Sequence, residues 1–368
     1  MSADGSAKTF PCPNCGGELA WDPARQEMHC PYCDSLIPVP SDPGFAPEEQ
    51  DLMAFLKDHP RSTGYGVTLK QFTCRQCGAS VQIPPRERSV VCPFCGSDYV
   101  LESGAAQANV LKPESLLPFS VDDKACRTAF KKWIGSGWFH PRDLKKMGKL
   151  ERIMGLYLPF FTFDAHADST WTAMAGHAYY VSESFTGRDS NGNAVQRSRQ
   201  VRRIRWEPAS GSRSDNYNDV LVPAVHEDRL DMILKVYPYD LVKLTAYDPR
   251  YLAGFGVLNA DIPVKLVYHI ASNNMAQDQR RLCAESVPGD TYRDLAVNTR
   301  FSKQTFKHLL CPVWAGAFRY RKRSYPFVLN GQTGKLYGRK PLSTVKVTLA
   351  ALVGAALALF LLWLMMRS

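Results

Sequence analysis

The sequence lacks the motifs of several enzyme classes. Its eight histidines form no H-E-x-x-H pair, and no G-x-S-x-G segment occurs. The nearest approach to the phosphate-binding loop G-x4-G-K-[ST] is Gly331-Gln332-Thr333-Gly334-Lys335-Leu336, which has two residues between its glycines and leucine where a magnesium-binding hydroxyl belongs. These residues instead predict a hairpin turn, and we predict that the protein is not an enzyme.

A signal peptide is also missing. The first ten residues, MSADGSAKTF, contain no apolar run, so we expect no export of the N-terminal portion. A long apolar run lies instead near the other end, where residues 347–366 carry no charge. As a helix, these residues extend about 30 Å, the thickness of a hydrocarbon core. We predict a transmembrane helix over residues 345–366, in tail-anchored topology.

Neither sign of charge dominates the whole chain, but the charge is divided unevenly. Lys and Arg total 45 against 35 Asp and Glu, whereas residues 1–110 hold only 8 basic and 13 acidic side chains. The positive charge therefore belongs to residues 111–368. Basic residues just before the apolar run favour a cytosolic position for the large N-terminal portion. They are Lys335, Arg339, Lys340 and Lys346.

Eight of the eleven cysteines occur in a repeated pattern. Cys12, Cys15, Cys30 and Cys33 form C-x2-C-x14-C-x2-C, and Cys74, Cys77, Cys92 and Cys95 repeat it 62 residues later. Cytosolic thiols stay reduced, so this pattern favours metal sites over disulfides. It is typical of zinc ribbons, and we predict two zinc ions per chain. An iron–sulfur cluster is less favoured, because clusters usually show closer serial spacing. Cys126, Cys283 and Cys311 occur singly and are expected to be buried structural thiols.

The charge of the ribbons indicates their partners. Residues 8–38 hold two basic and four acidic side chains, and residues 70–102 hold four basic and three acidic side chains. Four thiolates on one zinc ion add further negative charge. Ribbons that bind phosphates need surplus Lys and Arg. We therefore predict that the ribbons contact proteins rather than nucleic acid.

Residues 111–342 combine helical and strand patterns. Helices are predicted from a Ser120 cap to about Ile134, restarting at Pro141, and over residues 228–236 and 262–284. Aromatic and β-branched runs predict four short strands: YLPFFTF, HAYYVSESF, QVRRIRW and DVLVPAV, with DSNGNA as a turn. The fold class that follows is an α+β body.

The predicted order has five parts. They are zinc ribbon 1 over residues 8–38, a linker over 39–69 with at most one short helix, zinc ribbon 2 over 70–102, the α+β body over 111–342, and the transmembrane helix.

One group of side chains fits a metal-dependent hydrolase. A strand would place Asp164, His166 and Asp168 on one face, because side chains alternate with period two. Phe163 and Ala165 would then face the core, and a solvated polar face is the favoured interpretation of the three.

Two basic clusters in the body suggest contact with an anionic lipid surface. The first comprises Arg197, Arg199, Arg202, Arg203 and Arg205. The second lies close to the span, and the membrane-surface residues predicted there are Arg319, Arg321, Lys322, Arg323, Arg339, Lys340 and Lys346. Solvated strand faces remain an alternative, and so does nucleic-acid binding, because aromatic and basic residues interleave in FRYRKRSYPF.

Several segments resemble a family of bacterial zinc-ribbon membrane proteins. They are LLPFSVDDKACRTAFKKWIGSGWFHPRDLKK, GLYLPFFTFDAHAD, DVLVPAV, YDPRYLAGF and FKHLLCPVWAGAFRYRKRSYPFVLNGQTGKLYGRKPLS, behind the two ribbons and before the span. Members of this family are often labelled primosomal-helicase-like and occur with phage-shock-type and SPFH/flotillin-like membrane proteins. The resemblance implies membrane recruitment of such partners at the bacterial inner membrane, and it transfers no catalytic residue.

These observations predict a non-enzymatic, tail-anchored adaptor on the cytosolic face of the membrane. The runner-up is a membrane-tethered nucleic-acid-binding protein. The hydrolase built on Asp164, His166 and Asp168 is the third and least favoured hypothesis.

Overall fold

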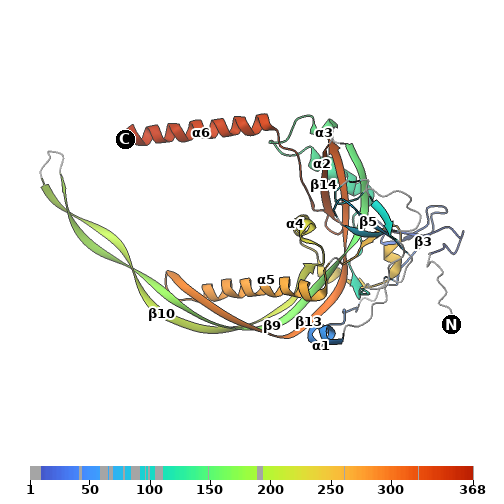
Figure 1. The fold of residues 1–368 in the computed structure, drawn as a ribbon, viewed down its shortest axis with the longest axis horizontal. Helices are drawn as coiled ribbons and strands as arrows, with labels where there is room; N and C mark the ends of the chain where they lie inside the picture. Colours follow the sequence, from blue (N-terminus) through green and yellow to red (C-terminus); the bar gives the residue numbers. More distant parts are fainter. Residues whose placement is uncertain are drawn as a thin grey trace.

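The computed structural model describes residues 10–40, 44–58, 65, 69–77, 79–83, 92–95, 97, 100–103, 111–147, 149–188, 194–260, 262–321 and 323–367. A body at one end carries a long β arm, and a single helix extends from the body on the same side as the arm (Figure 1).

Three very long antiparallel strands form the arm and the centre of the body. They are β9 (Lys149–Arg188), β10 (Ala194–Pro223) and β13 (Thr291–Tyr320). β9 lies between the other two, and its pairing with β13 ends at Gly176 opposite Thr291. Beyond Gly176, β9 and β10 continue together as a two-stranded ribbon (Figure 1).

The prediction of an α+β body is correct only in part, because most of the body is β sheet. The strands continue through the positions where the sequence suggested that they end. Each long strand pairs with a neighbouring strand along its length, which keeps the chain extended there. The four predicted short strands therefore belong to β9 and β10. Most of the predicted DSNGNA turn, residues 189–193, lies outside the described residues.

Helix α5 (Val264–Glu285) covers one face of the arm (Figure 1). Its buried side chains recur every fourth residue: Val267, Ala271, Met275, Gln279 and Cys283. This spacing forms one stripe along a helix. The stripe packs against apolar side chains of the arm, including Phe163 and Phe306.

The two ribbons join the body differently. The strands of ribbon 1 are β1 (Ala20–Asp22), β2 (Glu27–His29) and β3 (Leu36–Ile37), and they form a separate sheet. Those of ribbon 2 are β5 (Lys70–Cys74), β6 (Ser80–Ile83) and β7 (Val100–Ser103). β6 pairs with β12 (Gly256–Leu258), which runs parallel to β9. Ribbon 2 therefore extends the central sheet.

Part of the segment predicted as a linker, residues 39–69, packs on the body. β4 (Gln50–Asp51) pairs with β13 at Thr305 and Phe306. Helix α1 (Leu52–Asp58) follows it directly, and Leu52 is fully buried. The linker was predicted to hold at most one short helix, and α1 is that helix, packed on the body through Leu52.

Several local predictions are confirmed, and two predicted helix starts are corrected. α2 (Asp123–Ile134) ends before Gly135 as expected, but its N-cap is Asp122 rather than Ser120, because Asp122 accepts the Ala125 N–H at 2.6 Å. The helix predicted to restart at Pro141 begins three residues later, as α3 (Leu144–Met147), so that predicted start is wrong. α4 (Glu227–Lys235) matches the predicted helix closely.

Small elements complete the body around the long strands. β8 (Ser115–Leu116) pairs with β13 and with β11 (Thr245–Ala246). Single helical turns η1 (Leu241–Lys243) and η2 (Pro249–Leu252) flank β11. β14 (Arg323–Asn330) and β15 (Leu336–Gly338) form the hairpin predicted around Gly331–Leu336. In its turn, Asn330 Oδ1 accepts the N–H groups of Gln332 and Thr333.

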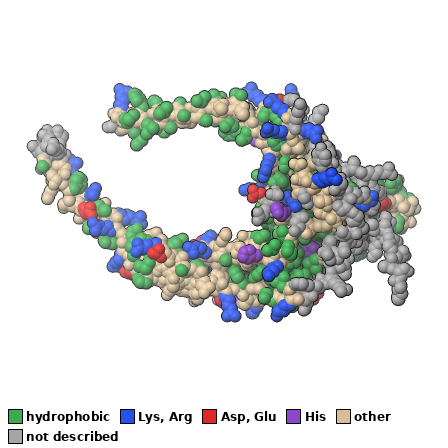
Figure 2. All heavy atoms as spheres, in the orientation of Figure 1, with side chains coloured by type: hydrophobic (Ala, Val, Ile, Leu, Met, Phe, Trp, Pro, Cys, Tyr) green, Lys and Arg blue, Asp and Glu red, His purple; other side chains and the backbone are tan. Residues whose placement is uncertain are grey.

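Helix α6 (Thr344–Arg367) confirms the apolar helix predicted near the end of the chain. It is long and apolar enough to cross a membrane, and its spanning segment has no buried residue. Hydrophobic side chains cover α6, whereas Lys and Arg side chains occur along the arm and around the first turn of α6 (Figure 2).

Candidate functional site

The first cysteine cluster has the geometry of a tetrahedral metal site. Sγ of Cys12 lies 3.6 Å from that of Cys33, and Sγ of Cys15 lies 3.5 Å from that of Cys30. All four sulfurs lie within 4.8 Å of one another. A tetrahedron with metal–sulfur bonds of about 2.3 Å has sulfur–sulfur edges of about 3.8 Å. The four predicted ligands therefore can hold one metal ion.

The second cluster repeats this geometry. The Cys74–Cys95 and Cys77–Cys92 sulfur distances are both 3.6 Å. A hydrogen bond with Cys92 lowers the pKa of the Cys77 thiol to about 5. In the first cluster, hydrogen bonding with the Ser35 hydroxyl lowers the pKa of Cys33 to about 6. Burial raises the pKa of Cys95 in the second cluster to about 12, so the thiols of one cluster differ in how readily they ionise.

The turns of ribbon 1 present the sulfurs to a common centre. Gly16 N–H donates to the Cys12 carbonyl at 2.8 Å, and Asp34 N–H donates to the Cys30 carbonyl at 2.9 Å. Gly16 has φ of +72°, which favours glycine at this turn. Gly78 and Gly96, which follow Cys77 and Cys95 in ribbon 2 as Gly16 follows Cys15, lie outside the described residues.

The clusters differ in exposure. Cys15 and Cys33 of ribbon 1 are exposed, and Tyr32 between its ligands is 71% exposed. In ribbon 2 the corresponding Cys77 and Cys95 are only partly exposed. Phe94, at the position of Tyr32, is buried, and its ring centroid lies 5.4 Å from the Arg229 guanidinium carbon on α4. The identical ligand spacing contains no signal for this difference, which depends on what packs around each ribbon.

Ribbon 1 is fixed to the body by its β hairpin. The indole N–H of Trp21 donates to the Phe119 carbonyl at 3.4 Å, and the Gln26 side chain donates to the same carbonyl at 2.7 Å. The backbone N–H of Trp21 donates to the Ala253 carbonyl at 3.1 Å. These contacts are made by the β1–β2 hairpin, and Cys15 and Cys33 stay exposed.

Asp164, His166 and Asp168 share one face of β9 as predicted, but each is engaged by β10. Asp164 accepts the Asp219 N–H at 2.7 Å, His166 lies 2.7 Å from Asn216 Oδ1, and Asp168 accepts from Ser214. Phe163, Ala165 and Ala167 are buried on the other face. Within the described part of the chain, only the two cysteine clusters bring three or more potential metal ligands together.

The basic residues predicted near the span fall into two groups. Arg319, Arg321, Arg323 and Arg339 are exposed on the surface, while Lys322 lies outside the described residues. Lys340 donates to the carbonyls of Trp133 and Ser136, and Lys346 donates to those of Trp138, at 2.8 Å, and His140. These two lysines therefore hold the start of α6 against the segment after α2.

The arginines on the arm are mostly on one face. Opposite residues of β9 and β10 share a face, and the register puts Arg197, Arg199, Arg203 and Arg205 on the same side as Glu183 and Phe185. Arg202 lies on the other side. Glu183 accepts a 2.6 Å hydrogen bond from Arg203 and lies 3.5 Å from Arg199.

The three single cysteines are buried structural thiols, as predicted. Cys126 packs in the cluster around α2, Cys311 in the sheet beneath α4, and Cys283 between α5 and the arm. Each has no measurable exposure.

Comparison with known proteins identifies one distant relative. The chain is 25% identical over 342 residues to the uncharacterized protein YdjG of Bacillus subtilis (strain 168), and the similarity covers 92% of each chain. No model of a known protein family matches the sequence. No solved structure matches it.

Proposed function

We propose that the protein is a non-enzymatic adaptor that holds two zinc ions, is anchored by α6 and recruits proteins to the cytosolic face of the bacterial inner membrane. The observation that carries this proposal is the exposed cysteine end of ribbon 1, on a ribbon whose strands are fixed to the body. The resemblance to zinc-ribbon membrane proteins suggests phage-shock-type or SPFH/flotillin-like partners in a membrane-stress response.

Zinc fits both clusters because each offers four sulfur ligands near tetrahedral separation. Four protein ligands leave no open position for water or substrate, which is typical of structural rather than catalytic zinc. Ribbon 2 braces the central sheet through β6 and β12. Ribbon 1 forms a sheet of its own, so it is the ribbon that we expect to contact partner proteins.

The exposed end of ribbon 1 has the composition of a protein-binding surface. Tyr32 is 71% exposed and Leu36 is 43% exposed, and Asp34 lies between them in the sequence. Exposed aromatic and aliphatic side chains provide the buried anchors of interfaces, and nearby charge selects the partner. The acidic character of this ribbon favours a basic partner surface.

Anchoring by α6 requires a change in its direction. α6 and the arm leave the body toward the same side (Figure 1), so a bilayer crossed by α6 in this direction would also contain the arm. The arm carries Arg199, Arg203 and Glu183, and charges are costly in hydrocarbon. On insertion, α6 therefore turns away from the arm about residues 339–343, which form neither helix nor strand.

The test is co-purification of phage-shock-type and SPFH proteins with the full chain from detergent-solubilised membranes. A Tyr32→Ala, Leu36→Ser variant should lose the partner while keeping two zinc ions. The matched control is Val242→Ser, which alters a side chain that is 95% exposed on the body. Equal recovery of the partner with all three proteins would contradict the adaptor hypothesis for this surface. Removing residues 1–102 is less informative, because it also removes β5 and β6 from the central sheet.

Nucleic-acid binding is the second candidate, and the arginines of the arm favour it more than the FRYRKRSYPF segment does. In the FRYRKRSYPF segment, Phe318 and Tyr320 are buried, so they offer no stacking surface. On the arm, by contrast, the Arg199 guanidinium carbon lies 5.7 Å from the centroid of the exposed Phe185 ring. Salt titration on single-stranded DNA with Arg199→Gln, Arg203→Gln against the wild type tests this candidate. Tight, salt-sensitive binding lost in the variant would support it over the adaptor.

A further inference from the structure

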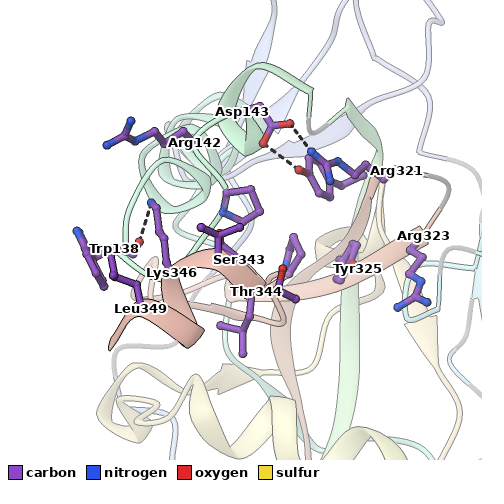
Figure 3. A pocket seen from close by; sticks show the side chains of 15 residues that line it. Trp138, Arg142, Asp143, Arg321, Arg323, Tyr325, Ser343, Thr344, Lys346 and Leu349 are labelled. Atoms are coloured by element: carbon purple, nitrogen blue, oxygen red, sulfur yellow. Dashed lines mark hydrogen bonds and ion pairs between the residues drawn. The ribbon is translucent and has the colours of Figure 1, made fainter. Parts of the chain in front are cut away.

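A pocket lies where α6 meets the body. Its volume is about 740 Å³, and its walls come from three separate parts of the sequence. Trp138 and Arg142 belong to the segment between α2 and α3, Arg321 and Arg323 to the β13–β14 hairpin, and Lys346 to the first turn of α6. Arg323 lies across the pocket from Trp138 and Lys346 (Figure 3). We call this site the neck pocket.

The neck pocket is strongly cationic. Four basic side chains line it, Arg142, Arg321, Arg323 and Lys346, against the single carboxylate of Asp143. That carboxylate accepts hydrogen bonds from Tyr320, at 2.9 Å, and from Arg321, at 3.1 Å (Figure 3). The Asp143 carboxylate is therefore already paired within the pocket wall. The surplus of three positive charges calls for an anionic ligand.

Two of the arginines are available to such a ligand. Arg142 and Arg323 are exposed, and within the described part of the chain neither guanidinium group has a hydrogen-bonding or ionic partner. Arginine matches the oxygen spacing of phosphate with two parallel donors. Three of the four cations belong to the body, so they remain beside the start of the span when α6 turns.

The position of the pocket indicates where the anion comes from. The pocket opens at the first turn of the helix that is apolar enough to cross a membrane, which is the level of the lipid headgroups. Trp138 is 59% exposed there, and tryptophan is enriched at this level of membranes. Leu342, Val345 and Leu349 line the same pocket and are exposed, forming an apolar side next to the cationic one.

We propose that the neck pocket binds the headgroup of an anionic phospholipid from the cytosolic leaflet. Arg142 and Arg323 bind the phosphate and Arg321 adds charge, and these three arginines belong to the body and keep their places when α6 turns. The inference rests on the proposed insertion of α6.

The experiment measures bound lipid by native mass spectrometry. Purified full chain in neutral detergent receives phosphatidylglycerol or phosphatidylcholine at matched concentrations. We expect one phosphatidylglycerol per chain to bind in preference to phosphatidylcholine. Arg142→Gln, Arg323→Gln should weaken that binding roughly 30-fold, at about a factor of five per charge. Arg142→Lys, Arg323→Lys should restore part of it, since charge returns without the paired donors.

The matched control removes two arginines elsewhere in the body, Arg280→Gln and Arg300→Gln, and should bind the lipid as the wild type does. Equal binding of both lipids, or equal phosphatidylglycerol binding by the Arg142/Arg323 variant and the wild type, would overturn the proposal. Displacement of the lipid by millimolar inorganic phosphate would assign the pocket to a free anion and also overturn it. Alkaline extraction of membranes separately reports insertion. A chain that resists extraction but shows no lipid preference refutes the headgroup site while leaving the proposed anchoring intact.

Discussion

Trp21 of ribbon 1 packs edge-on against Tyr251 of the body, with ring centroids 4.5 Å apart. Trp21 is 5% exposed and Tyr251 is 4% exposed, so both rings are buried on assembly. The contact joins a ribbon built from residues near the start of the chain to a turn more than two hundred residues later. Ribbon 1 is therefore held in a fixed position, which a surface that recruits a partner needs.

Replacing Trp21 by Ala should loosen this docking without emptying the metal site. Loss of a buried aromatic side chain costs about 3–5 kcal/mol. We expect faster hydrogen exchange across β1, β2 and the η2 turn, with two metal ions retained. Tyr32→Ala is the matched control, because Tyr32 lies on the same ribbon but is exposed, and it should leave exchange unchanged. Unchanged exchange in the Trp21 variant would show that other contacts hold the ribbon.

Loss of one cysteine should have different consequences in the two ribbons. Cys30→Ser and Cys92→Ser should each reduce the zinc content from two ions per chain to one, because binding energy in such ribbons is folding energy. Cys30→Ser should unfold ribbon 1 and spare ribbon 2. Cys92→Ser should also lower the melting temperature of the body, since β6 pairs with β12 in the central sheet.

Metal analysis of the purified protein and thermal melts of both variants check this prediction. A content of one ion or none in the wild type, or mainly iron, would contradict the zinc assignment. Equal melting temperatures for the two variants would show that ribbon 2 does not brace the body.

Removing residues 344–368 should release the protein from the membrane fraction. The cationic side chains that remain on the body and arm bind an anionic leaflet weakly, and salt screens that attraction. Fractionation at low and high salt is the measurement. A truncated chain that stays with the membranes at high salt would reveal a second apolar anchor and would contradict the tail-anchored topology.

Local sequence signals predicted the parts of the fold that local interactions determine. The end of α2 at Gly135, the position of α4, and the turn closed by Asn330 all follow from residues a few positions apart. The two cysteine clusters, which could each hold a metal ion, also follow, because C-x2-C places two thiols on one turn. These features needed no knowledge of the rest of the chain.

Features that depend on distant residues were not predictable. Whether strand pairing continues through Gly176 or stops depends on a neighbouring strand, so four expected short strands became two long ones. The pairing of Val257 with Gln82 joins ribbon 2 to the body across a long sequence separation. The neck pocket likewise unites Trp138, Arg323 and Lys346, and no spacing in the sequence signals that they meet.

The buried His308 should make stability depend on pH. His308 is 2% exposed and stacks on Phe161 with ring centroids 4.9 Å apart. Burial lowers its pKa to about 4, whereas an unfolded histidine titrates near 6.5. Above pH 6.5 both states are neutral and His308 has no effect. As the pH falls from 6.5 to 4, the unfolded chain binds a proton at this histidine and the folded protein does not. The free energy of unfolding therefore decreases by about 3 kcal/mol.

Glu114 acts in the opposite direction over part of this range. Burial raises its pKa to about 7, above the unfolded value, so its contribution is present at low pH and is lost as the pH rises. Burial also raises the pKa of Asp164 to about 6, so a pH profile of the wild type alone mixes the effects of several groups. His308→Phe keeps an aromatic ring against Phe161 and removes only the titrating group, so the difference between the two profiles isolates His308. We expect the variant to lose less stability than the wild type between pH 6.5 and 4, measured by denaturant titration in detergent at each pH. Parallel profiles would show that His308 takes up its proton in the folded protein as readily as in the unfolded chain.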